Sequence, residues 1–432
     1  MTKDIPTLKP KVWDIFLEYE VRIVEMEDTM LIVKKFGGSS VADKDRIFNV
    51  AQRCIEDYNK GHQVVVVLSA MGKTTDELLE KANEINPNAS KRELDMLLTT
   101  GEQVSVALMA MAIQALGVPV VSLNAWQVAM HTTSRYTQAK VKRIDTERIF
   151  NELEMKKIVV VTGFQGINKY DDLTTLGRGG SDTTAVALAA ALHADTCEIY
   201  TDVEGVYTAD PRIVPNARKM KEVTYDEMLD FASLGAKVLH NRCVELAKKY
   251  SVQLVVRSSL NNAEGTIVKE EVKNMEKMLI SGVAADKNTA RISVMGVKDE
   301  PGIAFRVFNY LSRKGINVDI ILQSVGREGT KDISFTVAKT DLKDALETIH
   351  ENMDGITAKK VEYEEHVAKV SIIGAGMTSN PGVAAKMFEA LFGVGINIKM
   401  ISTSEIRITV LIDEADTERA MRAVHDAFAL GE

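Results

Sequence analysis

Short apolar runs alternate with helical patterns from residue 31 to about residue 270 of the 432-residue chain. Val64–Val67 is valine at every position, which is typical of a strand buried on both faces. In Lys44–Tyr58 the apolar positions fall on one stripe of a helix. The predicted strands are Leu31–Phe36, Val64–Leu68, Val118–Leu123, Ile158–Thr162, Glu198–Thr201 and Leu254–Val256. This alternation predicts an α/β fold with a mainly parallel sheet between helices on both faces.

The last third of the chain contains an internal repeat. Pro301–Phe308 returns 80 residues later as Pro381–Phe388, and Gly315–Asp319 returns as Gly395–Lys399. Each copy predicts a strand, a Pro-Gly turn, a helix, a Gly-Ile-Asn turn and a further strand. The repeat therefore predicts a pair of small α+β domains. The charged stretch Lys269–Lys277 is the expected linker before them.

Four segments are expected along the chain. Residues 1–30 form an N-terminal extension, or else Met30 is the true start. Residues 31–270 form the α/β domain, and 280–362 and 363–432 form the two repeat domains. The second repeat domain is expected either to be complete in itself or to borrow a strand from 264–285.

The composition narrows the classes of function. Hydrophobic residues make up 45% and charged residues 26%, and the net charge of −8 comes with no basic block, so a nucleic-acid-binding surface is not expected. No apolar run reaches the roughly 18 residues of a membrane span, and residues 1–29 contain no signal peptide. We expect buried free thiols, no metal site and a cytoplasmic location, because neither C-x-x-C pairs nor metal-type histidine spacing occur. The residues concerned are Cys54, Cys197, Cys243, His131, His193 and His240.

Two motifs resemble nucleotide-binding fingerprints but lack an essential glycine. Gly72–Thr74 resembles the end of a P-loop, yet Val67 stands where the first glycine is required. Gly374–Gly376 begins like a dinucleotide fingerprint, yet Ser379 takes the place of the last glycine. We therefore predict neither a P-loop protein nor a dehydrogenase.

The segment Lys35–Ser40 (Lys-Phe-Gly-Gly-Ser-Ser) ends the first predicted strand. Its paired glycines allow the backbone to approach a phosphate group with N–H groups pointing inward. Its lysine would supply a positive charge for phosphate oxygens. By itself, the segment fits a solvent-exposed lysine before a tight turn equally well.

A second glycine-rich segment, Leu176–Thr183, precedes an alanine-rich helix that ends near His193. The free N–H groups of a helix N-terminus form an anion site. Arg178 lies between glycines, where its guanidinium suits a planar carboxylate or phosphate. Asp182 or Ser181 is also a good N-cap, so a purely structural role for that position stays open.

The third segment, Tyr200–Arg212, follows another predicted strand. It combines Asp202 at the strand end, two tyrosines, and Arg212 after a proline. A tyrosine can stack on a purine and an arginine can reach a phosphate, although Tyr207 fits loop packing as well. Ligands of such sheets bind beyond the carboxyl ends of the strands, so the three segments together predict an anion site there.

Together these segments resemble the amino acid kinase family and, within it, the aspartate kinases. The matching segments are Lys35–Ser40, Ser69–Leu78, Thr100–Glu102, Gly163–Gly166, Arg178–Asp182, Thr201–Arg212 and Gly235–His240. The repeats resemble paired ACT domains, which bind amino acids. The resemblance covers roughly residues 31–432 in order. It implies a three-layer αβα sandwich of the amino acid kinase fold, followed by two βαββαβ ACT domains.

The resemblance implies that ATP, with Mg²⁺ held mainly by its phosphates, phosphorylates the side-chain carboxylate of L-aspartate to 4-phospho-L-aspartate. This is the first step of the lysine (diaminopimelate), threonine and methionine branch. The implied catalytic residues are Lys35, Arg178 and Asp182. The implied substrate contacts are Ser39, Thr75, Glu102 on the ammonium group and Arg178 on the α-carboxylate. The implied nucleotide contacts are Lys35, Gly37, Gly38, Ser39, Thr201, Asp202, Tyr207, Arg212, Lys237 and Val238.

The resemblance further implies feedback inhibition by lysine, threonine or both, and a homodimer or higher oligomer formed through the ACT domains. In each repeat the Pro-Gly turn opens a helix whose free N–H groups can bind an effector carboxylate. The implied effector residues are Asp299, Gly302, Ile303, Ala304, Asn317 and Gln323 in the first copy and Asn397 in the second. Asn397 fits a plain turn-forming role almost as well.

Two other functions stay open at this point. The acceptor could be glutamate or another small carboxylate, or the chain could be an amino-acid sensor with a retired kinase domain. The pair Glu102 and Arg178 argues against the first alternative. The retained charges of Lys35, Arg178 and Asp182 argue against the second.

Overall fold

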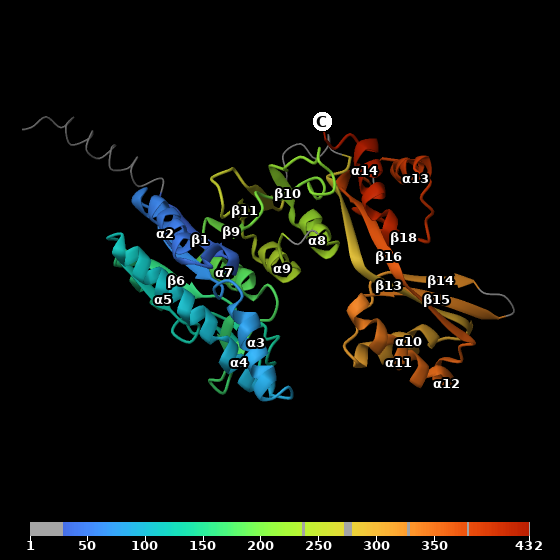
Figure 1. Cartoon of the computed structure of the whole chain (residues 1–432), viewed down its shortest axis with the longest axis horizontal. Coiled ribbons are helices and arrows are strands. Elements are labelled where there is room, and N and C mark those ends of the chain that lie inside the picture. Colours follow the sequence, from blue (N-terminus) through green and yellow to red (C-terminus); the bar gives the residue numbers. More distant parts are fainter. Residues whose placement is uncertain (1–28, 236–237, 272–278, 326–328, 378–379, 432) are drawn as a thin grey trace, which may run out of the picture. The chain divides into compact units, whose positions relative to one another are not determined.

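The computed structural model describes residues 29–235, 238–271, 279–325, 329–377 and 380–431. Residues 1–28 of the expected extension, most of the expected linker and Lys237 lie outside the described residues. The described chain divides into two compact units, whose elements are labelled in Figure 1. The first unit holds the residues up to Glu204 together with Arg242–Lys269, and the second holds Gly205–Asn241 and the chain from Glu270 onward.

The first unit is built around a mainly parallel sheet. Its strands run in the order β12-β11-β9-β1-β2-β6-β3, in which β12 pairs antiparallel with β11 and the other pairs are parallel. A smaller sheet has the order β5-β4-β7-β8. The bounds are β1 (Leu31–Phe36), β2 (Gln63–Leu68), β3 (Val120–Leu123), β4 (His131–Thr132), β5 (Val141–Arg143), β6 (Ile158–Thr162), β7 (Gln165–Ile167), β8 (Leu173–Thr175), β9 (Thr196–Thr201), β11 (Leu254–Ser258) and β12 (Thr266–Lys269).

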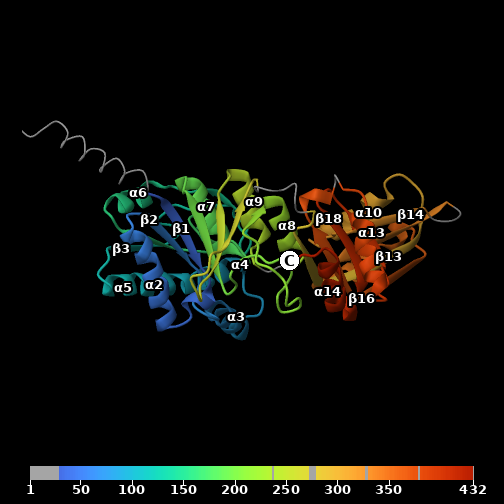
Figure 2. The same ribbon diagram turned by 90° about the horizontal axis from the view of Figure 1, so that it is seen from above.

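Helices cover both faces of the parallel sheet. The bounds are α2 (Lys44–Asn59), α3 (Thr74–Ile85), α4 (Lys91–Leu98), α5 (Thr100–Ala115), α6 (Glu147–Glu154), α7 (Gly180–Leu192) and α9 (Asn241–Tyr250). Figure 2 shows α2 and α5 on one face and α6 and α7 on the other. The α2 and α5 face buries Val64, Val66 and Leu68 of β2. Val64–Val67 are all fully buried because both faces of β2 are covered.

The second unit is built around one antiparallel sheet that serves both repeats, in the order β14-β15-β13-β16-β18-β17. Its strands are β10 (Glu222–Thr224, outside this sheet), β13 (Gly282–Lys298), β14 (Ile321–Val325), β15 (Thr330–Val337), β16 (Lys360–Ile373), β17 (Met400–Thr403) and β18 (Arg407–Asp413). Its helices are α8 (Tyr225–Ser233), α10 (Ile303–Arg313), α11 (Leu342–Glu351), α12 (Met353–Ile356), α13 (Val383–Gly393) and α14 (Thr417–Ala427).

The two long central strands, β13 and β16, each belong to both repeats. Residues Arg291–Met295 of β13 pair with the first half of β16, and Gly282–Asp286 pair with its second half. Irregular pairing between Asp286 and Arg291 separates the halves. The first repeat packs α10 and α11 over Ile292, and the second packs α13 and α14 over Val370 and its neighbours. Each repeat thereby gets a four-stranded sheet and a core of its own.

The predicted fold class is confirmed. The chain has an α/β domain with a mainly parallel sheet, followed by two βαββαβ-type repeats. Cys54, Cys197 and Cys243 are buried, as expected. The helical stretch Lys91–Ala115 is long and apolar enough to cross a membrane by composition, but 56% of its most apolar window is buried in the structure, as in a core helix.

Candidate active site

Lys35 and Asp182 form an ion pair at the carboxyl end of β1. Alternate residues of a strand point to opposite faces, so Lys35 points toward α7 while Lys34 and Phe36 point toward α2. The Lys35 Nζ atom lies 2.7 Å from Oδ1 of Asp182, which is in the first turn of α7. The two side chains are only 11% and 14% exposed. An ammonium group with three donors is therefore fixed at the strand end, with capacity for further acceptors.

The loop after β1 packs directly against the loop after β2. A Cβ atom at Gly38 would lie 2.6 Å from the carbonyl oxygen of Ala70, so only glycine fits there. The Gly72 N–H donates to the Gly38 carbonyl over 3.0 Å. The hydroxyl of Ser40 is buried and has no hydrogen-bond partner in the described part of the chain. The loop thus brings glycine backbone close to Lys35, since a Cβ atom at Gly37 would lie 3.4 Å from Lys35 Nζ.

Glu102, in the first turn of α5, is a buried carboxylate with one oxygen unused. It is 3% exposed. Its Oε1 accepts a 3.1 Å hydrogen bond from the N–H of Ala70, and Oε2 has no partner among the described residues. Burial raises the pKa of Glu102 to about 7, against the opposing effect of the Ala70 N–H. Such a carboxylate is suited to receive a cationic group from a ligand.

Arg178 is exposed and forms no ion pair with any residue that the structure describes. The glycines on either side, Gly177 and Gly179, have φ angles of 78° and 65°. Glycine adopts this left-handed conformation freely, and here it turns the chain from β8 into α7. The guanidinium group is therefore available for an anionic ligand.

Two serines near the same strand ends received no ligand-binding role from the sequence, and Ser181 is not the N-cap that it could have been, because Gly179 precedes α7. The hydroxyls of Ser69, after β2, and Ser181, in the first turn of α7, are 2.9 Å apart. A Cβ atom at Gly163 would lie 2.6 Å from the Ser181 hydroxyl, so this glycine makes room for the pair. Both serines belong to segments already singled out, which was the available signal. Thr75 lies half-buried at the start of α3.

Lys34 anchors a buried ion network that the sequence did not indicate. Its Nζ atom contacts Asp57 of α2 and lies 3.0 Å from Oε2 of Glu198 on β9. Arg257 of β11 approaches the other Glu198 oxygen at 2.8 Å, and the Tyr200 hydroxyl donates to Oε2 over 2.9 Å. Burial opposes the charge of Lys34, but its acidic neighbours hold its pKa well above the usual value. The network fixes β1 against β9 and α2.

The predicted nucleotide residues divide between the two units. In the first unit, Thr201 Oγ1 accepts a 3.1 Å hydrogen bond from the Val203 N–H, and Asp202 is exposed. In the second unit, the 88% exposed Arg212 lies 2.7 Å from Asp210 Oδ2. Tyr207 forms an isolated bridge with Lys219, Val238 is half-buried, and Lys237 lies outside the described residues.

The predicted effector residues of the first repeat lie on two stretches: Asp299–Ala304 lead into the start of α10, and Asn317 and Gln323 follow its end. Gly302 precedes this helix with a φ angle of 91°, and Ile303 is buried. Asp299 Oδ1 lies 2.7 Å from Lys331 Nζ. Asn317, on the turn before β14, and Gln323, on the edge strand β14 itself, are exposed. Ala304 is half-buried, and Asn397 is exposed in the corresponding turn of the second repeat.

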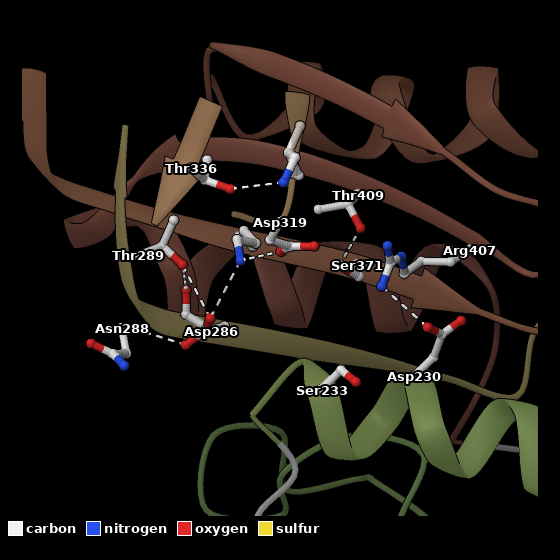
Figure 3. Close-up of polar contacts among 12 residues, drawn as sticks. Asp230, Ser233, Asp286, Asn288, Thr289, Asp319, Thr336, Ser371, Arg407 and Thr409 are labelled. Carbon is white, nitrogen blue, oxygen red and sulfur yellow. Dashed lines mark hydrogen bonds and ion pairs between the residues drawn. The ribbon is translucent and has the colours of Figure 1, made fainter. Parts of the chain in front are cut away.

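Next to the first of these turns lies an ion cluster, drawn in Figure 3. Lys369 of β16 is 6% exposed. Its Nζ atom lies 2.5 Å from Asp319 and 3.6 Å from Asp286. Asp319 belongs to the same turn as Asn317, so the cluster ties the predicted effector turn of the first repeat to the strand half that serves the second. On the same sheet, Arg407 of β18 binds Asp230 of α8 at 3.1 Å.

The described residues contain no group of three or more His, Cys, Asp or Glu side chains suited to hold a metal ion. What the first unit does bring to the strand ends is positive charge and hydrogen-bond donors. Lys35 and Arg178 are cationic, and Glu102 offers one carboxylate oxygen for a ligand cation. This combination is suited to bind a zwitterionic ligand beside an anion.

Comparison with known proteins is consistent with this chemistry. Residues 30–258 match the model of the amino acid kinase family, and 292–353 and 370–428 match that of an ACT domain. An aspartokinase of Bacillus sp. (strain MGA3) is 50% identical over 400 residues, which are 93% of this chain and 97% of that protein. Two crystal structures of E. coli aspartokinase III match as well. Each alignment covers 92% of this chain and 99% of the E. coli chain. The complex with aspartate and ADP (R-state) has 27% identity and a TM-score of 0.78. The complex with lysine and aspartate (T-state) has 28% identity and a TM-score of 0.75.

Proposed function

The chain belongs to the amino acid kinase family as one of its aspartokinases, and on this premise we propose how its residues phosphorylate aspartate and which amino acids regulate it. In the proposed reaction the side-chain carboxylate of L-aspartate attacks the γ-phosphate of ATP, giving 4-phospho-L-aspartate and ADP. The observation that carries the assignment of residues is the Lys35–Asp182 pair at the end of β1, together with Glu102 in the first turn of α5, which accepts a hydrogen bond from Ala70 of the neighbouring loop.

The chemical problem is that two anions have to meet. Phosphoryl transfer passes through a loose transition state, so the protein acts mainly by positioning and by neutralising charge. No general base is needed, because the side-chain carboxylate of aspartate is already ionised near pH 7. We propose that the Lys35 ammonium group neutralises the transferring phosphoryl group and that Asp182 holds this ammonium group in place. The backbone of Gly37 and Gly38 and the Ser39 hydroxyl contribute hydrogen bonds to phosphate oxygens.

The amino-acid head group of the substrate is assigned to Glu102 and Arg178. Oε2 of Glu102 has no partner among the described residues and would accept hydrogen bonds from the ammonium group. The exposed guanidinium of Arg178 would hold the α-carboxylate with two parallel hydrogen bonds. Thr75 is proposed as a further contact. With both head-group charges held, the side-chain carboxylate is left to face the phosphoryl group.

We propose that the loops after β1 and β9 bind the nucleotide, together with predicted nucleotide residues of the second unit. The proposed contacts beyond the first loop are Thr201, Asp202, Tyr207, Arg212, Lys237 and Val238. Mg²⁺ would be held mainly by the nucleotide phosphates, where it neutralises their charge. We propose a cytoplasmic location because the sequence spaces its three cysteines far apart and the structure buries them as thiols, which is typical of a protein from a reducing compartment.

We propose that lysine, threonine or both inhibit the enzyme through the ACT-type repeats, as feedback on the lysine, threonine and methionine branch. The aspartokinase III structure with lysine supports lysine as an effector class. The proposed contacts are Asp299, Gly302, Ile303, Ala304, Asn317, Gln323 and Asn397. We also propose a dimer or higher oligomer through these repeats. The domain limits proposed for the chain remain 1–30, 31–270, 280–362 and 363–432.

The decisive experiment measures ATP turnover with aspartate, trapping the acyl phosphate as its hydroxamate, and uses glutamate as the control acceptor. We expect hydroxamate with aspartate and little with glutamate. Equal turnover with glutamate would contradict the acceptor assignment. The same assay, repeated with lysine and threonine singly and together, identifies the effector.

A further inference from the structure

We propose that Asp95 is a positioning residue for substrate binding: its buried carboxylate fixes the segment that carries Arg178, and so sets Arg178 against Glu102. This inference rests on the proposed function, in which Glu102 binds the ammonium group of aspartate and Arg178 binds its α-carboxylate. Asp95 itself touches neither substrate nor nucleotide in this proposal. It acts through the backbone of the Thr175–Arg178 segment.

The carboxylate of Asp95 is fully buried in the first unit and accepts hydrogen bonds from three donors, one of which is shared between its two oxygens. It lies on α4 and is 0% exposed. Its donors are the Thr137 N–H at 2.9 Å, the Thr175 N–H at 3.0 Å and the Thr175 hydroxyl at 2.7 Å. A carboxylate has two acceptor oxygens and no donor, which matches three converging donors. An asparagine would turn an NH₂ group toward some of these donors and lose their hydrogen bonds.

These contacts hold the two stretches of chain that shape the turn before Arg178. Thr175 is the last residue of β8, and its carbonyl accepts a 2.9 Å hydrogen bond from the Ala139 N–H. Thr137 has a φ angle of 64°, which is unusual for a residue with a Cβ atom. Its carbonyl oxygen would lie 2.9 Å from a Cβ atom at Gly177. Asp95 therefore fixes both the strand that leads into Gly177 and the strained residue packed against it.

Arg242 of α9 closes the same segment from another side. Its guanidinium donates to the carbonyl of Leu176 and, over 2.9 Å, to the carbonyl of Ala139. The Leu176 N–H donates to the Phe164 carbonyl over 2.8 Å. The backbone leading to Arg178 is thus held by α4, by α9 and by Phe164, while the Arg178 side chain remains exposed. Such rigidity would lower the cost of ordering the guanidinium when the α-carboxylate binds.

Asp95 and Glu102 lie on consecutive helices, α4 and α5, which meet at Thr99. They are seven residues apart, which is about two helical turns, and Thr99 between the helices has φ and ψ angles of −63° and −14°, close to those of a helix, so both residues lie on about the same side. The Thr99 carbonyl at the junction accepts a 2.5 Å hydrogen bond from Gln165. One helical segment therefore carries Glu102 directly and positions Arg178 through Asp95. The spacing of the two head-group contacts is set by this segment.

The test compares Asp95→Asn with a matched control in the full-length enzyme. Glu152→Gln removes another buried carboxylate, 4% exposed and paired with Arg148 and Lys157, which has no contact with the Thr175–Arg178 segment among those described. For Asp95→Asn we expect KM for aspartate to rise about tenfold or more, the equivalent of about 1.4 kcal/mol. KM for ATP should stay within about twofold. Glu152→Gln should lower the melting temperature without moving KM for aspartate.

A second variant covers the possibility that Asp95→Asn does not fold. Thr175→Val removes one of the three donors at nearly constant volume and should raise KM for aspartate by a smaller factor, while Thr175→Ser, which keeps the hydroxyl, should restore it. Two results for Asp95→Asn would overturn the proposal. One is a fall in kcat with KM for aspartate and KM for ATP unchanged, and the other is an equal rise in these two KM values. If Arg178→Ala also left KM for aspartate unchanged, the head-group assignment itself would be wrong. If only the Asp95 and Thr175 variants had no effect, the positioning role alone would fail.

Discussion

Lys35 Nζ and Asp182 Oδ1 are 2.7 Å apart, although the residues are separated by 147 positions in the chain. The contact joins the end of β1 to the first turn of α7, so it exists only because those two elements are neighbours in the fold. It holds a cation at a helix N-terminus, where backbone N–H groups also favour an anion. We take this pair as the centre of the proposed phosphoryl site.

Replacing Lys35 by alanine should abolish turnover while leaving the fold intact. Removing one charge from a preorganised site of this kind costs about 10²–10³-fold in kcat, and more where no other group compensates. The measurement is steady-state hydroxamate formation, with circular dichroism to confirm folding. The exposed Lys81 provides a control, since Lys81→Ala should have wild-type activity. A Lys35→Ala enzyme with near-normal kcat would remove Lys35 from the mechanism.

Replacing Arg178 by lysine should weaken aspartate binding even though the charge is kept. A guanidinium forms two parallel hydrogen bonds with a carboxylate, and an ammonium group cannot reproduce them. We expect KM for aspartate to rise about 10- to 100-fold, as for the loss of a charged hydrogen bond worth about 1.5–3 kcal/mol. KM for ATP serves as the internal control. An unchanged KM for aspartate would place the α-carboxylate elsewhere.

The affinity for aspartate should depend on pH through Glu102. Burial raises the pKa of this carboxyl to about 7, so in the free enzyme a large fraction is protonated at slightly acid pH. Only the ionised form attracts the substrate ammonium group. KM for aspartate should therefore rise as pH falls below about 7, by up to about tenfold per unit, and level off above it. Glu102→Gln should raise KM and remove this dependence, and a wild-type profile flat from pH 6 to 8 would contradict the assignment.

Lys34 should matter for stability rather than for catalysis. Its side chain is 2% exposed and neutralises Asp57 and Glu198. Lys34→Ala would leave the buried Glu198 with Arg257 as its cationic partner and the half-buried Asp57 with the exposed Lys60, at a cost of about 3–5 kcal/mol in the free energy of unfolding. Denaturant unfolding measures this loss. The double variant Lys34→Met with Glu198→Gln should recover part of it, whereas a loss below about 1 kcal/mol would show that the network is not stabilising.

Gln323→Ala should relieve inhibition by the effector amino acid with little change in the uninhibited rate. Gln323 is an exposed residue on the edge strand of the regulatory sheet, so its removal should not cost stability. We expect the half-inhibitory concentration to rise about tenfold, which corresponds to about 1.4 kcal/mol of lost differential binding. The same inhibition assay on Asn397→Ala tests whether the second repeat binds the effector. Superimposable inhibition curves for Gln323→Ala and wild type would show that this residue does not sense the effector.

Much of the fold was predictable because it follows from local patterns. The valine run Val64–Val67 predicted a strand covered on both faces, and the structure places β2 over Gln63–Leu68 with helices on each side. The helix predicted over Lys44–Tyr58 is α2, Lys44–Asn59. The repeat in the last third predicted two similar domains. The sequence left open whether the second repeat borrows a strand from 264–285 and did not indicate that β13 and β16 both run through the two repeats, because strand pairing across about 75 residues leaves no local signal.

The sequence by itself determined the strand-end segments, the repeat and the residue types that can meet a phosphate and an amino acid. Those properties depend on spacing along the chain and on side-chain chemistry. Only the tertiary structure decided that Lys35 pairs with Asp182, that Glu102 is buried with a free oxygen, and that Asp95 reaches Thr175. Lys34 and Lys35 are adjacent in sequence, yet one joins a buried network and the other points to the opposite face. Burial and long-range contact set these differences, and neither can be read from one residue and its neighbours.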